Sequence, residues 1–213
     1  GILDAIGADN KGHVGGSMSA ADIVAALYFY KMNHSPDRIN DSDRDRFIFS
    51  KGHSALTQYA ALAECGYFSK SELPKTKTLG AMLQGHPERD YTPGVECNTG
   101  SLGQGLSIGL GMALGGKLDG RDYKVYVILG DGELGEGQVW EAATAASFYK
   151  ADNLVAIIDH NQLMATGPIK ECFDVGNIGA KFAAFGWKVF EIDGHDMEEI
   201  VDVLGEADEV KGL

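Results

Sequence analysis

The chain has 213 residues, 44% of them hydrophobic and 23% charged, which is ordinary globular composition and enough length for one sizeable core. Its formal net charge of −13 argues against nucleic acid and membrane surfaces as partners, because both attract basic proteins. Three cysteines without C-x-x-C spacing suggest neither a disulfide framework nor a zinc site, and no apolar run reaches the roughly 20 residues of a membrane span. We therefore expect a soluble, cytoplasmic protein.

In the first half of the chain, helical spacing predicts a packing helix over residues 19–32, capped by Ser19. The side chains expected on its packing face are Ile23, Leu27 and Tyr30. A short apolar element follows at 47–50, and helical spacing resumes over 54–65, so a loop presents His53 between two elements. Residues 66–102 contain three prolines and no long periodicity, which predicts surface loops.

The second half alternates helical patterns with apolar runs. Helices are expected over 103–118, 136–149, 178–185 and 197–204, and strands over 124–129, 154–158 and 187–192. This alternation predicts an α/β fold with a parallel sheet, right-handed crossovers and helices on both faces. We expect a single domain over 1–213 that is shortened at both ends, because Gly1 is not a methionine and no cap or tail follows the last helix.

Asp131 and Asn161 each follow the end of a predicted strand within one βαβ unit, thirty residues apart. In open parallel sheets ligands bind beyond the carboxyl ends of the strands, so the two side chains can converge on one cation. A carboxylate, an amide oxygen and a carbonyl such as that of Leu163 suit Mg²⁺, which leaves positions for diphosphate oxygens and water. A G-D-G triplet alone is more typical of a plain turn, but the presence of Asn161 thirty residues after Asp131 favours the metal site.

Six motifs stand in a fixed order, namely GHVGGS, SKGHS, GHPE, TGSLGQG, GDGELGEG and DHNQL. The last two resemble the thiamine-diphosphate signature, and the whole set resembles transketolase, in particular the N-terminal, diphosphate-binding subunit of a split transketolase. The resemblance implies the thiamine-diphosphate-binding fold of a PP-type domain. It also implies that Asp131, Asn161 and the Leu163 carbonyl hold Mg²⁺. Gly132 would then meet the diphosphate, and Gly100 and Leu102 would lie against the pyrimidine.

His13, His53 and His86 each follow a glycine in one of these motifs. A single loop histidine is usually solvated, but three on loops around one crevice favour a proton-handling cluster, because imidazole titrates near neutral pH. The resemblance implies that they contact the substrate or the aminopyrimidine. The other histidines, His34, His160 and His195, are expected to stabilise turns.

Three glutamates crowd the start of the helix beyond Asp131. Acidic residues favour a helix N-terminus, and Glu133 is interpreted in this way. Glu136 and Glu141 correspond to a proton relay between the two active sites of transketolases, and the resemblance gives them that role. Trp140 is expected to pack in the core or at an interface.

The resemblance also implies a partner, because the chain contains no pyrimidine-binding domain and no glutamate to activate the cofactor. We expect a C-terminal transketolase subunit to supply both, in a heterotetramer with two copies of each subunit. The substrates would be sugar phosphates of the pentose phosphate pathway. Val14 and Ala165 depart from the family pattern, which has a proline and a larger apolar residue at these positions.

Three alternatives remain. The chain could serve another thiamine-diphosphate enzyme, of the 2-oxo acid dehydrogenase or deoxyxylulose phosphate synthase type, although the three histidines suit polyol substrates better. It could be a non-catalytic relative that only binds the cofactor. A dinucleotide-binding Rossmann domain is disfavoured because Gly103-Gln104-Gly105 has no strand before it.

Overall fold

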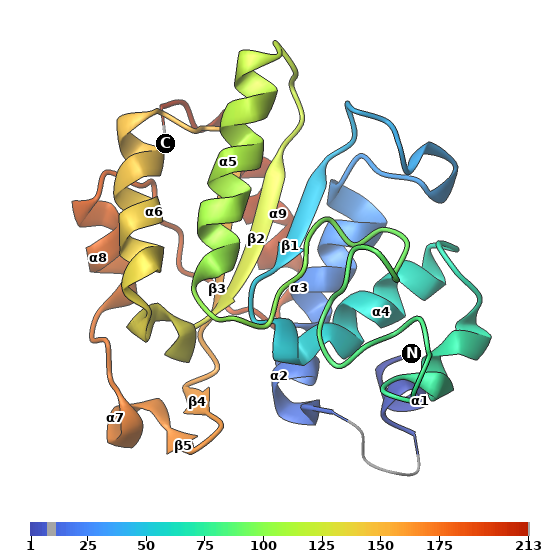
Figure 1. Cartoon of the computed structure of the whole chain (residues 1–213). Helices are drawn as coiled ribbons and strands as arrows, with labels where there is room; N and C mark the ends of the chain where they lie inside the picture. Colours follow the sequence, from blue (N-terminus) through green and yellow to red (C-terminus); the bar gives the residue numbers. More distant parts are fainter. Residues whose placement is uncertain (8–11, 213) are drawn as a thin grey trace.

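The fold is built on a parallel sheet of three strands in the order β1-β2-β3 (Figure 1). The structure is a computed structural model that describes residues 1–7 and 12–212. The strands are β1 (Arg46–Phe49), β2 (Val125–Gly130) and β3 (Leu154–Asp159), and Val125 pairs with both Arg46 and Leu154. The connection from β2 through helix α6 (Gly137–Phe148) to β3 is the predicted βαβ unit. The predicted α/β class with a parallel sheet is therefore confirmed.

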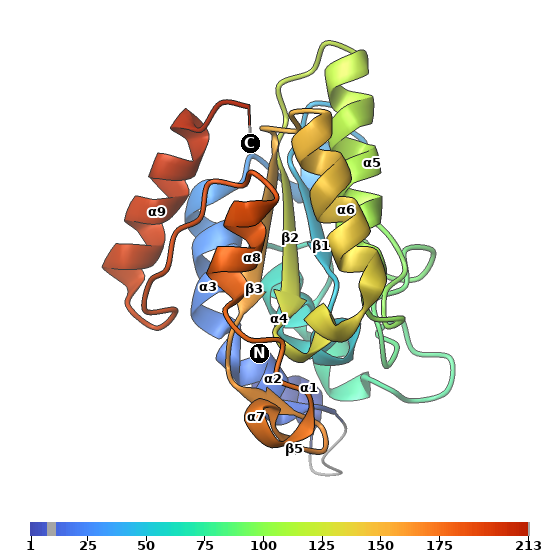
Figure 2. The same ribbon diagram turned by 90° about the vertical axis from the view of Figure 1, so that its left-hand side faces the viewer.

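Helices cover both faces of the sheet, as Figure 2 shows from the side. Alternate strand residues explain the two layers, since Phe47, Tyr126 and Ile128 point into one core and Ile48, Val127 and Leu129 into the other. The first core packs against α1 (Ile2–Ile6), α3 (Ala21–Ala26), α4 (Ala55–Glu64) and α9 (Met197–Glu209). The second packs against α5 (Gln104–Leu118), α6 and α8 (Ile178–Ala184).

The first long helix differs from its prediction. Residues 14–31 form α2 (Val14–Ser19), α3 and a π-helical turn, η1 (Leu27–Lys31). Ser19 therefore ends a helix and caps none, and its hydroxyl instead donates to Asp159. Tyr30 is 67% exposed, because the wider π turn rotates the chain by about one residue and buries Tyr28. The predicted packing face is thus wrong at Tyr30 and right at Leu27.

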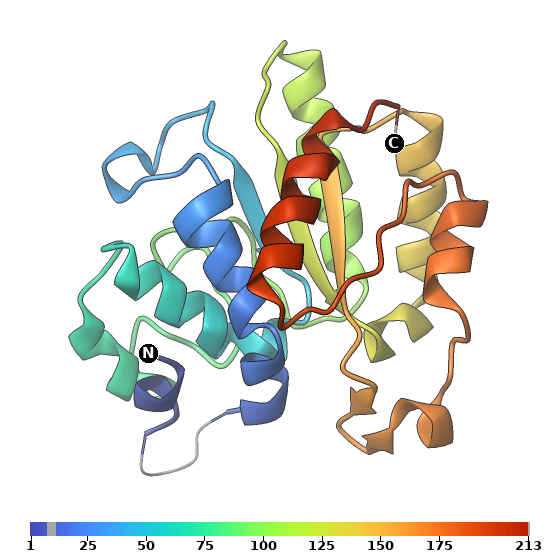
Figure 3. The same ribbon diagram turned by 180° about the vertical axis from the view of Figure 1, so that it is seen from behind.

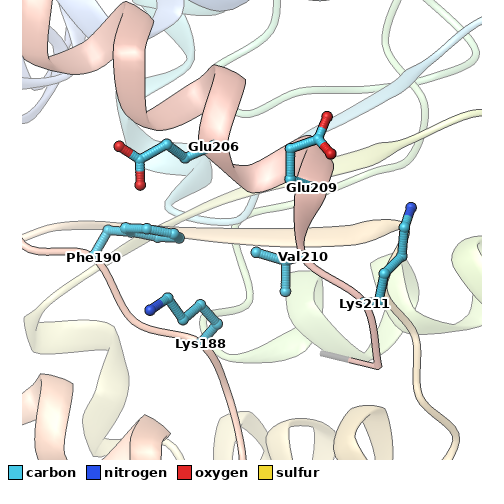
Figure 4. A pocket seen from close by; sticks show the side chains of 6 residues that line it. All are labelled: Lys188, Phe190, Glu206, Glu209, Val210 and Lys211. Atoms are coloured by element: carbon cyan, nitrogen blue, oxygen red, sulfur yellow. The ribbon is translucent and has the colours of Figure 1, made fainter.

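The predicted strand at 187–192 is not a strand. Residues 187–192 form no helix and belong to neither sheet of the described residues. A cavity of about 770 Å³ is lined by β3 on one side and by residues of this segment on the other, so the two backbones do not pair. The segment runs beside α9 (Figure 3), and Figure 4 shows Lys188 and Phe190 facing a hollow below Glu206.

Short elements complete the chain. They are the 3₁₀ turns η2 (Pro36–Arg38), η3 (Gly52–Ser54), η4 (Lys70–Lys75) and η5 (Gly132–Gly135), the hairpin β4 (Leu163–Met164) and β5 (Gly167–Pro168), and helix α7 (Ile169–Cys172). The loops predicted over 66–102 are present, but they contain η4 and bury Leu73 and Leu83 in the first core. No helix among the described residues is long and apolar enough to cross a membrane.

Candidate functional site

The carboxyl ends of β2 and β3 bring Asp131 beside the loop that follows Asp159. Asp131 is 1% exposed. Its Oδ1 accepts a hydrogen bond from its neighbour Gly132 N at 2.8 Å, and its Oδ2 accepts one from Gln162 N at 2.6 Å. The aspartate thus holds the turn that follows β2 and the loop that follows β3, which is the convergence that the strand-end argument predicts.

The loop from Asn161 to Leu163 has a constrained conformation. Asn161 Oδ1 accepts from Leu163 N at 2.9 Å, and its Nδ2 donates to Ser19 Oγ at 3.3 Å. Gln162 has φ +63°, which is rare outside glycine and clusters at functional sites. The hydrogen bonds that Asp131 and Asn161 accept from Gln162 N and Leu163 N stabilise this strained turn, so the loop is preorganised.

The donor set at this site fits Mg²⁺ better than a softer metal. No group of three or more His, Cys, Asp or Glu that could hold a metal occurs among residues 1–7 and 12–212. The oxygens of Asp131, Asn161 and the Leu163 carbonyl are hard donors, and they are too few to fill an octahedral shell. A metal here would therefore need further oxygens, and a bound diphosphate would supply them.

A buried ion pair lies next to this loop. Lys51 Nζ donates to Asp159 Oδ2 at 2.5 Å, and both side chains are buried. Ser19 Oγ donates to the same carboxylate oxygen at 2.5 Å and accepts from Asn161, so the pair is connected to Asn161 through Ser19. The motif assignments missed Lys51, Asp159 and Ser19. A lysine directly after an apolar strand was the available signal, because a buried charge needs a partner.

The three motif histidines come together. The rings of His13 and His53 meet edge to face with centroids 5.1 Å apart. Burial, followed by the charges of Lys51, His13 and His86, lowers the pKa of His53 to about 4. Burial, followed by the charges of Lys77 and His13, lowers the pKa of His86. His53 and His86 are therefore neutral near pH 7, and a neutral imidazole has one ring nitrogen free to accept a hydrogen bond or a proton.

The other three histidines are not part of this cluster. His34 hydrogen-bonds to the Tyr67 hydroxyl at 2.9 Å and to the Tyr28 carbonyl at 2.8 Å, which fits a structural role. His195 is exposed and pairs with Asp22, and His160 is also exposed.

Two glycines let the histidine loops meet. A Cβ on Gly52 would lie 2.6 Å from Gly100 N, so the backbones after β1 and before α5 are in direct contact. Gly100 has φ +127°, and a Cβ there would lie 2.7 Å from His86 Cδ2. Leu102 follows and is half-buried. Gly100, one of the two residues expected at the pyrimidine, therefore lies against His86 and the loop of His53.

The glutamates differ from one another. Glu136, the N-cap residue of α6, and Glu141 within that helix are both exposed, where a partner could reach them. Glu133 is 3% exposed and lies in the first turn of η5, so it belongs to this 3₁₀ turn and not to the start of α6. Its burial raises its pKa, and hydrogen bonds from Ser50, Gly103 and Gly130 oppose that rise. Trp140 packs on Phe182 and Phe185, as expected for a core residue.

The departures from the family pattern are tolerated locally. Val14 is the first residue of α2, where His13 is the N-cap residue. Ala165 lies exposed in the turn between β4 and β5. The hydrogen bonds that hold Asp131 come from Gly132 and Gln162, and so do not depend on either position.

Comparison with known proteins gives concordant matches. The family described as "Transketolase, thiamine diphosphate binding domain" matches residues 2–212. An apulose-4-phosphate transketolase subunit of Phocaeicola vulgatus is 44% identical over 197 residues, which cover 92% of this chain and 70% of that protein. A 6-deoxy-6-sulfo-D-fructose transketolase subunit of a Clostridium species is 42% identical over 210 residues, which cover 99% of this chain and 76% of that protein.

The structural comparison agrees. The solved transketolase of Leishmania mexicana superposes with a TM-score of 0.93 at 33% identity. That match covers 99% of this chain and 33% of the solved one, so the chain spans about a third of a full-length transketolase.

Proposed function

The chain belongs to the transketolase family through its thiamine diphosphate-binding domain, and we propose that it holds thiamine diphosphate and Mg²⁺ for the transfer of a two-carbon ketol unit between sugar phosphates. The observation that carries the proposal is the buried Asp131 carboxylate, hydrogen-bonded to the loop of Asn161 and Leu163. These three residues would hold the metal, and Gly132 would lie at the diphosphate.

When bound, thiamine diphosphate would supply the nucleophilic carbon that ketol transfer requires. The chain would supply the proton transfers. His13, His53 and His86 form one cluster, in which the pKa of His53 and that of His86 are lowered, and substrate hydroxyls gain and lose protons during ketol transfer. His53 would also contact the cofactor with Gly100 and Leu102, and Gly100 N lies 2.6 Å from the position of a Cβ added at Gly52 in the His53 loop.

We further propose that a second polypeptide completes the site. The relatives in which the matched region covers 70% and 76% of the length are named as subunits, and the solved full-length transketolase is about three times as long as the matched region. The partner would contribute the pyrimidine-binding domain and the activating glutamate, in an assembly with two copies of each subunit. Glu136 and Glu141 lie exposed at α6, which is consistent with a relay that runs across a subunit interface.

A cofactor titration tests the metal and diphosphate assignment. Thiamine diphosphate is titrated with excess Mg²⁺ into the chain assembled with its partner, for the wild type and for Asp131→Asn. We expect the variant to bind at least about 100-fold more weakly, because the only carboxylate of the proposed metal set is lost. Asp43→Asn is the control, since Asp43 is an exposed partner of Arg121. Equal affinity of Asp131→Asn and the wild type would contradict the assignment.

Substrate assays separate the remaining functions. Ketose phosphates, among them apulose 4-phosphate, and the sulfonated ketose 6-deoxy-6-sulfo-D-fructose, both named for the bacterial relatives, are compared with pyruvate as donors for the assembled protein. Transfer from a ketose phosphate supports transketolase activity, and turnover of pyruvate alone would support the oxo-acid alternative.

The three cysteines are free thiols, which agrees with a reducing compartment such as the cytoplasm.

A further inference from the structure

Glu133 is the one buried carboxylate of η5, and no step of the proposed chemistry uses it. It lies two residues after Asp131, yet its side chain turns away from solvent into the space between three loops. A buried carboxylate requires several hydrogen bonds to be tolerated. Its partners therefore indicate what it does.

Three donors from three separate segments converge on this carboxylate. Oε1 accepts from the Ser50 hydroxyl and from Gly103 N at 2.8 Å. Oε2 accepts from Gly130 N at 3.0 Å. Ser50 Oγ also accepts from Gly105 N at 3.2 Å, so the network extends into the first turn of α5.

Each of these donors adjoins residues assigned to the site. Ser50 directly follows β1 and lies three residues before His53. Gly103 directly follows Leu102 and ends the loop of Gly100. Gly130 directly precedes Asp131.

We propose that Glu133 is a positioning residue that clamps the His53 loop, the Gly100–Leu102 loop and the Asp131 turn in one arrangement, so that the diphosphate end and the reacting end of the cofactor are held at the correct separation. The inference rests on the proposed function. Its physical basis is that one carboxylate holds three segments at once, through two backbone N–H groups and the Ser50 hydroxyl. Catalytic geometry is lost when reacting groups are displaced by about 1 Å.

Three variants of the assembled protein test this clamp. Glu133→Ala removes all three accepted hydrogen bonds. Glu133→Gln keeps the shape but turns one acceptor into a donor, so it retains at most two of them. Ser50→Ala removes one donor and the link to Gly105. The measurements are the Kd of thiamine diphosphate with excess Mg²⁺, kcat at saturating cofactor, and the Tm of the cofactor-free complex.

We expect the Kd to rise by about 10- to 100-fold for Glu133→Ala, and by less for the other two variants, with kcat also reduced. Asp45→Asn is the matched control. Asp45 is a buried carboxylate that accepts from Asn33 N and Lys124 N, both at 2.8 Å, at the opposite end of β1. Its replacement should lower the Tm and leave the Kd unchanged.

The outcomes distinguish the possibilities. If the Glu133 variants lower the Tm as Asp45→Asn does but keep the wild-type Kd and kcat, Glu133 is merely structural and the inference is wrong. If Glu133→Ala does not fold, Glu133→Gln and Ser50→Ala decide by the same criterion. Failure of the wild-type complex to bind thiamine diphosphate would overturn the proposed function, and this inference with it.

Discussion

At the scale of single residues, the site depends on side chains whose charge is set by their neighbours. His53 is half-buried, close to the ammonium of Lys51 and to two further imidazoles. Each of these neighbours disfavours its protonated form. The result is a histidine that stays neutral near pH 7, which is the state required of a proton acceptor.

The pKa of His53 can be measured directly. We expect its imidazole resonances in the cofactor-free protein to titrate near pH 4, with assignment by their loss in His53→Gln. Because the unfolded chain binds a proton at about pH 6.5, this group makes the protein less stable as the pH falls from 6.5 towards 4. His195 is an internal control, since its hydrogen bond to Asp22 raises its pKa. Titration of His53 above that of His195 would contradict the burial argument.

At the scale of elements, the site forms where the loops that follow the strands contact one another. The loop after β1 meets the loop before α5 through Gly52, with backbone atoms of Thr99 and Gly100 within 2.8 Å of the position of an added Cβ. Backbone atoms cannot rotate away as a side chain can. This contact therefore has room for glycine alone.

A pair of glycine substitutions tests this contact. Gly52→Ala should destabilise the protein by about 1–3 kcal/mol and weaken cofactor binding, because an added methyl group forces the two loops apart. Gly111→Ala, in the exposed middle of α5 with nothing within 4 Å, should stabilise it by about 0.5–1 kcal/mol through helix propensity. Denaturant unfolding and cofactor titration give both values. Similar stabilities of the two variants would show that the loops separate freely.

At the scale of the whole molecule, the sheet has a protected centre and an incomplete side. β2 has a partner strand on each side, whereas β3 pairs only with β2 among the described residues. Residues 187–192 and β3 line one cavity, and the backbone N–H groups of 188–192 have no main-chain acceptor within the described part of the chain. Backbone hydrogen bonding therefore decreases from β2, through β3, to residues 188–192.

Hydrogen exchange of the chain should reproduce this gradient. We expect the amides of Val125–Leu129 to exchange roughly 100-fold or more slowly than those of residues 188–192, because opening the central strand requires breaking two ladders. Mass spectrometry of peptic peptides resolves the two segments. Equal protection would mean that residues 188–192 have acceptors that the described residues do not provide.

Local patterns determined most of the architecture. Apolar runs predicted β2 and β3 to within one residue at each end, and helical spacing predicted α4, α5 and α6, because burial of a periodic face depends mainly on neighbouring residues. The π turn at Leu27–Lys31 and the unpaired segment at 187–192 were missed. Both depend on packing partners distant in sequence, which periodicity does not report.

For the site, the sequence by itself determined which residue types stand at the strand ends and in the motif loops, and so led to Asp131, Asn161 and the three histidines. Only the tertiary structure decided the connections among them. Lys51 meets Asp159 across 108 residues, and Glu133 meets Ser50 across 83. A carboxylate at a helix start interacts favourably with the helix N-terminus whether it is exposed or buried. Only the folded chain therefore shows whether it faces water or accepts hydrogen bonds from three loops.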